Sequence, residues 1–399
     1  MRIMHLSDLH IGKKIHGFSM LADQKYILDR ICEIARNQKP QAVIIAGDIY
    51  DQSVPSAEAV SMFDIFLAEM SKIADHIFII SGNHDSAERI AFGHKIMSKS
   101  GVHLSPVFDG NVRPMELEDE YGKICFYMLP FIMLHEARQI FAQAAKENNP
   151  ENPELPEIKS YNDIAITAVS RMEVNRECRN VLITHQFVTG AKECESEDII
   201  SVGGADNVNA DVFEPFDYVA LGHLHGPQHI ERDSIRYCGT PLKYSFSEKD
   251  HKKTLTMLEI GRKNAGEYAE IKINEIPLVP LHDMREIKGK YDELMLRENY
   301  INTNKEDYLH IILTDENDVP DGMARLRSVY PNAMLLDYDN QRTKNIPGLQ
   351  QLAASRSKSG LQLLEELYKM INGSEMDGNQ IEFAKEIFDD IGKDHQEGK

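Results

Sequence analysis

The sequence predicts an α/β protein whose first sheet is parallel, and two observations support this prediction. Three short apolar runs alternate with two amphipathic helical patterns over residues 1–80, and this alternation is typical of parallel strands joined by right-handed crossovers. Each apolar run is followed at once by side chains able to bind metal or move protons. Binding sites in open α/β sheets collect at this carboxyl end of the strands, so we expect a functional site there.

The elements of this first unit follow from the spacing of the apolar residues. In chain order, we predict a strand at residues 2–6, a helix at 21–37, a strand at 42–46, a helix ending near 70 and a strand at 76–80. The second helix is expected to begin after Ser56, whose hydroxyl can cap it. Its buried stripe is predicted to contain Val60, Phe63, Leu67 and Met70.

The middle of the chain mixes helices, strands and two long loops. Residues 107–122 are acidic and rich in turn formers, and residues 190–209 form a loop rich in Glu, Asp and Gly. We predict helices at 86–100, 133–146 and 162–177, strands at 123–129, 181–184 and 217–221, and shorter strands at 228–237, 254–260 and 268–276. The last three alternate in polarity and are expected to be antiparallel strands that close a second sheet.

The last third of the chain is organised differently. Pro277 and Pro280 mark a linker, after which we predict a small α/β unit with a helix at 284–296, a strand at 308–313, a helix at 322–330 and a strand at 333–336. Residues 338–360 have the composition of a flexible tether, and two amphipathic helices follow at 361–371 and 381–391. These helices can pack on the body or dock on a partner. We therefore place domains at residues 1–276, 277–340 and 341–399.

The composition indicates a globular protein with an excess of acidic residues. The 399 residues carry a formal net charge of −20, which argues against broad contact with phosphate backbones, although bound divalent metals would change the local charge. The five cysteines are scattered and form no CxxC pair, as expected for reduced thiols in a cytoplasmic protein. We find neither an apolar run of roughly 18 residues that could span a membrane nor a signal-peptide pattern.

A set of polar residues at five predicted strand ends forms the candidate site. They are Asp8, His10, Asp48, Asn83, His84, His185, His223 and His225. Any one of these histidines would more often be a satisfied core residue, but five strand ends carrying such side chains favour a shared site. Carboxylate, imidazole and amide oxygen suit Mn²⁺, Fe²⁺ or Zn²⁺. Eight such groups are too many for one ion and suit two metals about 3.5–4 Å apart with a bridging carboxylate.

These motifs, taken in order, resemble those of the calcineurin-like metallophosphoesterases. The matching segments are Asp8-Leu9-His10, Gly47-Asp48-Ile49-Tyr50-Asp51, Gly82-Asn83-His84-Asp85, His185 and Gly222-His223-Leu224-His225. Residues 1–12, 50–56 and 237–246 are similar in detail to the SbcD-type DNA-repair nuclease subunits of bacteria. The resemblance is strong over residues 1–260 and only architectural beyond. It implies a two-sheet sandwich flanked by helices, with a small α/β capping domain and C-terminal docking helices.

The resemblance also implies a role for each site residue. One Mn²⁺ would be held by Asp8, His10, Asp48 and His225, and the other by Asp48 as the bridge with Asn83, His185 and His223. His84 would be no ligand but would face the scissile phosphate and help to protonate the leaving oxygen, oriented by Asp85 unless Asp85 only forms the turn. Archaeal relatives have a second active-site histidine after the bridging motif, where this sequence has Asp51, so we assign that position no proton transfer.

The activity implied is that of a Mn²⁺-dependent DNA nuclease, with double-strand exonuclease and single-strand or hairpin endonuclease activity in repair and recombination. The implied partners are DNA, an SbcC-like coiled-coil ATPase bound by the C-terminal helices, and a second copy of the chain bound through helices near 56–72 and 88–99. The alternative is a phosphatase or phosphodiesterase for a small phosphoester. Asp51-Gln52-Ser53 stands where protein phosphatases have Asp-Arg-Gly, which weighs against that class, and a non-catalytic scaffold fits poorly because every motif residue is present.

Basic residues near these motifs are candidates for contact with a DNA backbone, although a solvated surface position is the more common fate of each. They are Lys13, Lys14, Arg89, Lys95, Lys243, Lys252 and Lys253.

Overall fold

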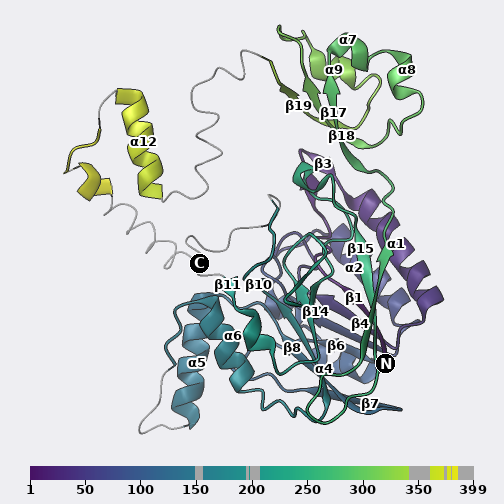
Figure 1. Cartoon of the computed structure of the whole chain (residues 1–399), viewed down its shortest axis with the longest axis vertical. Coiled ribbons are helices and arrows are strands. Elements are labelled where there is room, and N and C mark those ends of the chain that lie inside the picture. The colour runs from purple at the N-terminus through teal and green to yellow at the C-terminus, as the bar shows by residue number, and fades with distance from the viewer. Residues whose placement is uncertain are drawn as a thin grey trace.

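Two six-stranded sheets packed face to face form the body of the protein, and a three-stranded sheet forms a separate small domain (Figure 1). The computed structural model describes residues 1–148, 156–194, 197, 207–340, 360–372, 375–378 and 380–384. The mixed α/β architecture predicted from the sequence is confirmed.

The first sheet has a parallel core with two antiparallel strands at one edge. Its order is β16 (Ile271–Pro277), β15 (Thr254–Ile260), β1 (Arg2–Leu6), β4 (Ala42–Ala46), β5 (His76–Ile80) and β6 (Val102–Leu104). The last four strands are mutually parallel, and β15 is antiparallel to β1. The parallel core therefore brings the carboxyl ends of β1, β4 and β5 to one edge.

The second sheet has the same general design. Its order is β13 (Gln228–Ile230), β14 (Arg232–Tyr237), β12 (Tyr218–Gly222), β9 (Arg179–His185), β8 (Gly122–Leu129) and β7 (Met115–Asp119). The four central strands are parallel, and the two outer strands pair antiparallel with their neighbours. Two short strand pairs lie outside the sheets, β2 (Lys14–Ile15) with β3 (Phe18–Ser19) and β10 (Phe187–Val188) with β11 (Asn207–Val208).

The alternation of side chains along each strand builds a four-layer body. Ile44 and Phe78 point between the sheets, where Phe78 stacks on Phe126 of the second sheet with a centroid distance of 4.2 Å. Val43 and Ile45 point outward and pack under α1 (Leu21–Gln38) and α2 (Ala57–Met70). The opposite face of the second sheet is covered by α5 (Leu134–Asn148) and α6 (Tyr161–Ser170). Figure 1 shows these two helix pairs on opposite sides of the sheets.

The small domain is a parallel sheet of β17 (Met284–Gly289), β18 (Tyr308–Leu313) and β19 (Ala333–Tyr338). Short helices α7 (Tyr291–Leu294), α8 (Arg297–Tyr300) and α9 (Gly322–Leu326) complete it. Buried Asp23 of α1 joins the domain to the body, because its carboxylate accepts hydrogen bonds from His282 Nδ1 (3.0 Å) and the Tyr308 hydroxyl (2.7 Å). Beyond it, α12 spans Gly360–Asn372.

Several predicted elements differ from the structure. Strands 254–260 and 268–276 were expected in the second sheet, but β15 and β16 extend the first sheet beside β1. Alternating polarity identifies a strand and not its partner, which explains this error. The helix predicted at 284–296 was wrong over residues 284–289, which form β17, because pairing with β18 outweighs a spacing compatible with a helix.

Smaller errors have local causes. β7 lies inside the acidic stretch expected to be turns, because Met115 and Leu117 alternate there with glutamates. The helix predicted at 86–100 is broken into α3 (Ala87–Ile90), α4 (His94–Met97) and a 3₁₀ turn, with Gly93 in a left-handed conformation at φ +77°. The helix predicted at 162–177 ends at Ser170. The Ser56 cap is present, but Val60 is 45% exposed and Phe66 takes its place in the buried stripe.

Parts of the C-terminal prediction fall outside the described residues. They are residues 341–359 of the expected tether and residues 385–391 of the last helix. Among the described helices, none is both long and apolar enough to cross a lipid bilayer.

Two buried histidines predict how stability responds to acid. Burial lowers the pKa of His5 to about 3, and burial together with nearby His76 lowers the pKa of His103 to about 4. Both rings are neutral in the folded protein but take up protons near pH 6.5 when it unfolds. Their contribution is therefore complete above pH 6.5 and is lost as the pH falls toward 4, by up to about 1 kcal/mol per pH unit for each ring.

Urea unfolding of metal-free protein between pH 7 and 4.5 measures this effect. We expect His103→Gln, which removes the titrating group, to flatten the decline relative to the unmodified protein. His135→Gln on the exposed side of α5 is the control. Equal slopes for the two variants would contradict the assignment.

Candidate metal centre

The candidate site forms where the carboxyl ends of strands from both sheets meet. Asp8 and His10 follow β1, Asp48 follows β4, Asn83 and His84 follow β5, His185 ends β9, and His223 and His225 follow β12. Glycines let the two sheets approach at this edge. A Cβ atom on Gly222 would lie 1.9 Å from the Ala46 carbonyl oxygen, and one on Gly47 would lie 2.4 Å from His185 Nδ1.

The turns that carry the site have an unusual backbone. Asp8, His10, Asp48 and His223 all have positive φ values, of 53°, 44°, 49° and 106°. Such conformations cost of order 1–3 kcal/mol each for a non-glycine residue and collect at functional sites. The turns support one another, because Asp8 N donates to the Gly47 carbonyl and His10 N to the Asp48 carbonyl, each at 3.0 Å.

All eight predicted residues converge in the structure. Asp48 Oδ2 lies 3.4 Å from His185 Nε2, 3.7 Å from His10 Nε2 and 3.9 Å from His84 Nε2. Asn83 Oδ1 lies 2.9 Å from His185 Nε2 and 3.1 Å from His223 Nδ1. The rings of His10 and His225 meet edge-on, with their Nε2 atoms 3.2 Å apart.

Two triads within this group have the spacing of metal ligands. They are His10, Asp48 and His84, and Asp8, Asp48 and His185, with potential ligand atoms within 4.8 Å of one another. Asp48 belongs to both, which is the arrangement expected of a bridging carboxylate. A third triad, Cys194, His225 and Glu248, was not predicted, because Cys194 and Glu248 lie outside every motif.

Burial and mutual charge set the protonation of the cluster. Burial alone would raise the pKa of Asp48, but the neighbouring His185 holds it well below its usual range. The charge on Asp48 in turn raises the pKa of His185 to about 9 against the effect of burial. Burial lowers the pKa of His223 to about 3 and that of His10 well below its ordinary value. His10 and His223 are thus neutral imidazoles, the form that binds metals.

The buried polar atoms fit a divalent cation. Asp8 Oδ2 has no hydrogen-bond partner among the described residues, although the side chain is fully buried. Only one proton can lie between the facing Nε2 atoms of His10 and His225. A cation bound by these nitrogens and carboxylates would satisfy groups that protein contacts leave unsatisfied.

The contacts of His84 and Asp85 show whether Asp85 orients His84 or only forms the turn, which the sequence left open. The Asp85 carboxylate accepts backbone N–H groups of Ile49 (3.1 Å), Tyr50 (3.0 Å) and Gly82 (3.0 Å), so Asp85 holds the two turns together. His84 Nδ1 instead lies 3.0 Å from the carbonyl oxygen of Asp51. Asp85 is therefore the turn former, and the Asp51 main chain orients His84.

A second group of residues contacts the site histidines from outside the cluster, and the sequence assigned none of them to the metal site. Buried Glu248 and Lys253 form an ion pair beside His225, with 2.5 Å between Oε2 and Nζ. Gln24 Nε2 donates to the His10 carbonyl at 2.7 Å. These residues come from different elements and share no motif, so no local pattern could have predicted them.

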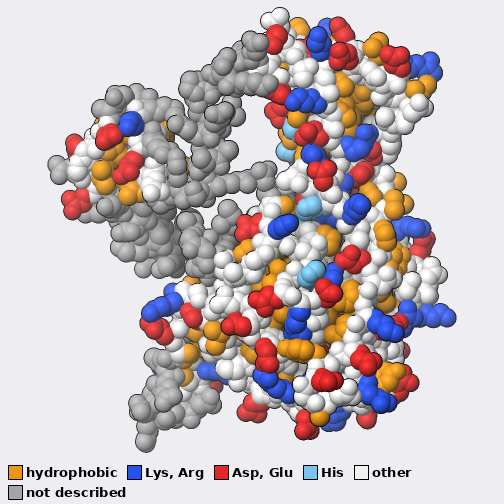
Figure 2. Space-filling view, in the orientation of Figure 1, with side chains coloured by type: hydrophobic (Ala, Val, Ile, Leu, Met, Phe, Trp, Pro, Cys, Tyr) orange, Lys and Arg blue, Asp and Glu red, His pale blue; other side chains and the backbone are white. Residues whose placement is uncertain are grey.

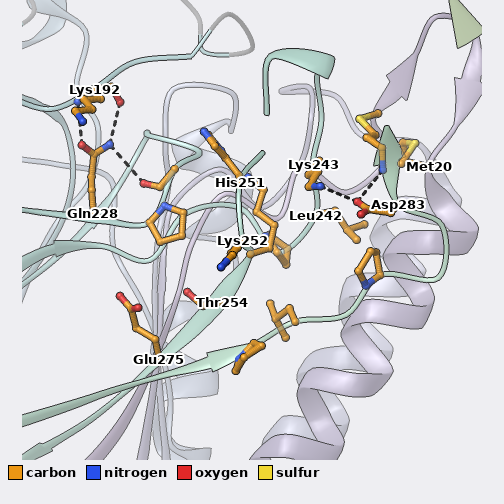
Figure 3. Close-up of a pocket in the computed structure, with 18 of the residues that line it drawn as sticks. Met20, Lys192, Gln228, Leu242, Lys243, His251, Lys252, Thr254, Glu275 and Asp283 are labelled. Atoms are coloured by element: carbon orange, nitrogen blue, oxygen red, sulfur yellow. Dashed lines mark hydrogen bonds and ion pairs between the residues drawn. The ribbon is translucent and has the colours of Figure 1, made fainter. Parts of the chain in front are cut away.

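A cavity of about 1100 Å³ adjoins this supporting group, between the body and the small domain. Figure 3 shows Lys243 directed at Asp283, with 2.8 Å between Nζ and Oδ1, and Gln228 hydrogen-bonded to the main chain of Lys192. Lys253 is buried by its contact with Glu248, whereas Lys252 is exposed. Among the basic residues predicted to be near DNA, Lys243 and Lys253 are thus engaged in internal contacts.

Two stretches of the sequence match known protein families. Residues 1–227 match the calcineurin-like phosphoesterase family, and residues 280–371 match the type 5 capsule protein repressor C-terminal domain. The SbcD subunit of nuclease SbcCD from Staphylococcus saprophyticus is 32% identical over 396 residues, which cover 97% of each chain. The solved structure of a dimetal phosphatase from Danio rerio aligns with a TM-score of 0.37 and 12% identity, covering 70% of this chain and 96% of the other.

The fold, the buried cluster and the family match together define a metal-dependent phosphodiester hydrolase. The chain belongs to the calcineurin-like phosphoesterases and, within them, to the family of the SbcD subunits of nuclease SbcCD.

The close approach of the sheets predicts the effect of enlarging Gly222. A Gly222→Ala methyl group would collide with the Ala46 carbonyl and would lie 2.7 Å from His185 Nδ1. We expect a loss of about 1–3 kcal/mol in the free energy of unfolding, measured by urea denaturation, and weaker metal binding. Gly378→Ala is the control, because nothing lies within 4 Å of its added methyl group. A Gly222→Ala protein of unchanged stability would show that the sheets separate more easily than the structure indicates.

Proposed function

We propose that this chain is the Mn²⁺-dependent nuclease subunit of an SbcC–SbcD-like complex that cleaves DNA phosphodiester bonds in repair and recombination. The observation that carries this proposal is the relation to the SbcD subunit of nuclease SbcCD, because it spans 97% of both chains and includes the small domain. To this chain we assign double-strand exonuclease and single-strand or hairpin endonuclease activity.

The ligand assignment follows the family pattern and is consistent with the geometry. Asp8, His10, Asp48 and His225 would hold one ion, and Asp48, Asn83, His185 and His223 the other. Asp48 Oδ2 lies 3.7 Å from His10 Nε2 and 3.4 Å from His185 Nε2, one histidine of each proposed set, which supports its role as the bridge. Ions bound here would polarise the phosphate and acidify a water molecule near neutral pH. Because the ligands are mostly buried, water is largely excluded and charge interactions with the phosphate are strong.

His84 is suited to assist the leaving group. Its side chain is 18% exposed, against 2% for Asp48, so it faces the open side of the cluster. The Asp51 carbonyl accepts a hydrogen bond from Nδ1, which leaves Nε2 directed toward the cluster. His84 must therefore carry a proton on both nitrogens when it protonates the leaving oxygen.

The rest of the chain would bring DNA and the partner to this site. We propose that residues 1–276 form the nuclease domain, that residues 277–340 form a DNA-facing cap, and that helices within 341–399 dock on the coiled coil of an SbcC-like ATPase. Figure 2 shows histidines along the face that runs from the small domain onto the body, with acidic and basic side chains around them. Helices α2 to α4 would form the homodimer contact, where Phe92 is 84% exposed and Ile96 is 76% exposed.

Substrate preference tests the proposal. With Mn²⁺, we expect the purified chain to degrade linear double-stranded DNA, and to degrade it faster with its ATPase partner present. Bis-p-nitrophenyl phosphate serves as the comparison substrate. Hydrolysis of the small ester without any attack on DNA, with or without the partner, would favour the alternative of a small-molecule phosphodiesterase.

Two substitutions separate metal binding from proton transfer. Asp48→Ala should lose metal and activity together, because it removes the bridging ligand. His84→Ala should keep both metals and lose turnover by about 10²–10⁴-fold, the usual contribution of a general acid. Elemental analysis alongside single-turnover kinetics distinguishes the two, and loss of metal from His84→Ala would show that His84 is a ligand.

A further inference from the structure

Glu248 lies outside every motif of the metal centre, yet it contacts one of its histidines. Its side chain is fully buried, and its Oε1 atom lies 3.1 Å from His225 Nδ1. Its other oxygen pairs with Lys253 Nζ. Lys253 also donates to the His225 carbonyl at 2.8 Å and to Thr240 Oγ1 at 2.6 Å. The Glu248–Lys253 pair therefore holds His225 through both its side chain and its main chain.

This contact determines which nitrogen of His225 can bind a metal. A carboxylate can only accept a hydrogen bond, so Nδ1 must carry the proton and donate it to Glu248. Nε2 is then left with its lone pair directed at the cluster, where it faces His10 Nε2 at 3.2 Å. Histidines that bind metals are commonly oriented in this way by a carboxylate behind them, and losing that partner typically weakens metal binding by about 10–100-fold.

The same network reaches His10, the other histidine on this side of the cluster. The Tyr244 backbone N–H donates to Glu248 at 3.3 Å, and the Tyr244 ring packs edge-on against His10 with centroids 5.7 Å apart. The Tyr244 hydroxyl donates to the Leu9 carbonyl at 2.6 Å.

The histidines on the other side are held differently. His185 Nδ1 contacts the Ala46 carbonyl at 2.9 Å, and His223 Nδ1 contacts Asn83. Glu248 thus contacts His225 directly and is linked to His10 through Tyr244, and these two histidines are assigned to the same ion.

We propose that Glu248, with its charge balanced by Lys253, is a positioning residue that selectively supports the ion held by Asp8, His10, Asp48 and His225. The proposal rests on the two-ion assignment of the proposed function. It predicts that disrupting the pair weakens the binding of this ion alone. The ion at Asn83, His185 and His223 should keep its affinity.

Removing one partner alone would leave a buried unpaired charge and can unfold the protein, whereas replacing both with apolar residues is often tolerated. The test therefore uses Glu248→Leu combined with Lys253→Met, compared with Glu248→Gln combined with Lys253→Met. Glutamine keeps an oxygen that can accept a hydrogen bond from Nδ1. Asp217→Asn combined with Lys263→Met is the matched control, since that buried pair (2.9 Å) lies at the amino end of β12.

Mn²⁺ titration of each metal-free protein by calorimetry and electron paramagnetic resonance gives the readout. We expect the leucine variant to bind one Mn²⁺ normally and the second about 10–100-fold more weakly, and the glutamine variant to recover most of that loss. The spectrum should change from that of a coupled pair to that of a single ion. The control should bind both ions as the unmodified protein does.

The proposal is overturned if the leucine variant binds both ions as tightly as the unmodified protein does. Equal weakening of both ions, or a fall in melting temperature well beyond that of the control, would also overturn it, because either would indicate a general structural role. If the unmodified protein itself fails to bind two ions, the two-ion assignment fails instead.

Discussion

The site depends on how closely the two sheets approach each other at one edge. A Cβ atom on Gly47 would lie 2.4 Å from His185 Nδ1 of the other sheet, and one on Gly222 would lie 1.9 Å from the Ala46 carbonyl oxygen. No side chain can be accommodated at such distances unless the neighbouring atoms move. The absence of side chains at these positions lets His185 and His223 of one sheet reach Asp48 of the other. The close packing of the two sheets at this edge therefore sets the positions of the site residues.

A second consequence of this packing is that the site is assembled from turns rather than from the strands themselves. Asp8, His10 and Asp48 adopt left-handed backbone conformations, which aspartate and histidine tolerate better than bulky or β-branched residues do. The backbone bonds between the first two turns, and the bonds of Asp85 to Ile49 and Tyr50, hold these conformations in place. These hydrogen bonds thus offset the conformational strain of the turns that carry the site.

Sequence reasoning predicted this edge well because its signals are local. β1, β4 and β5 begin and end where the apolar runs do, and a parallel sheet necessarily brings their carboxyl ends together. The sheet that contains β15 could not be predicted, since its pairing with β1 joins residues about 250 positions apart and leaves no local pattern. Glu248 escaped prediction for the same reason: a lone glutamate in a polar segment resembles any solvated residue until the fold buries it beside His225.

The charge of the chain limits how a polyanion could be held. With a net charge of −20, the protein as a whole repels a phosphate backbone, and attraction must come from local features. Lys243 and Lys253 are engaged with Asp283 and Glu248, so their positive charge is offset within the protein. Under the proposed function, the bound ions themselves would then supply much of the local positive charge. Exposed lysines such as Lys252 would add to this charge, so DNA binding would depend on metal occupancy.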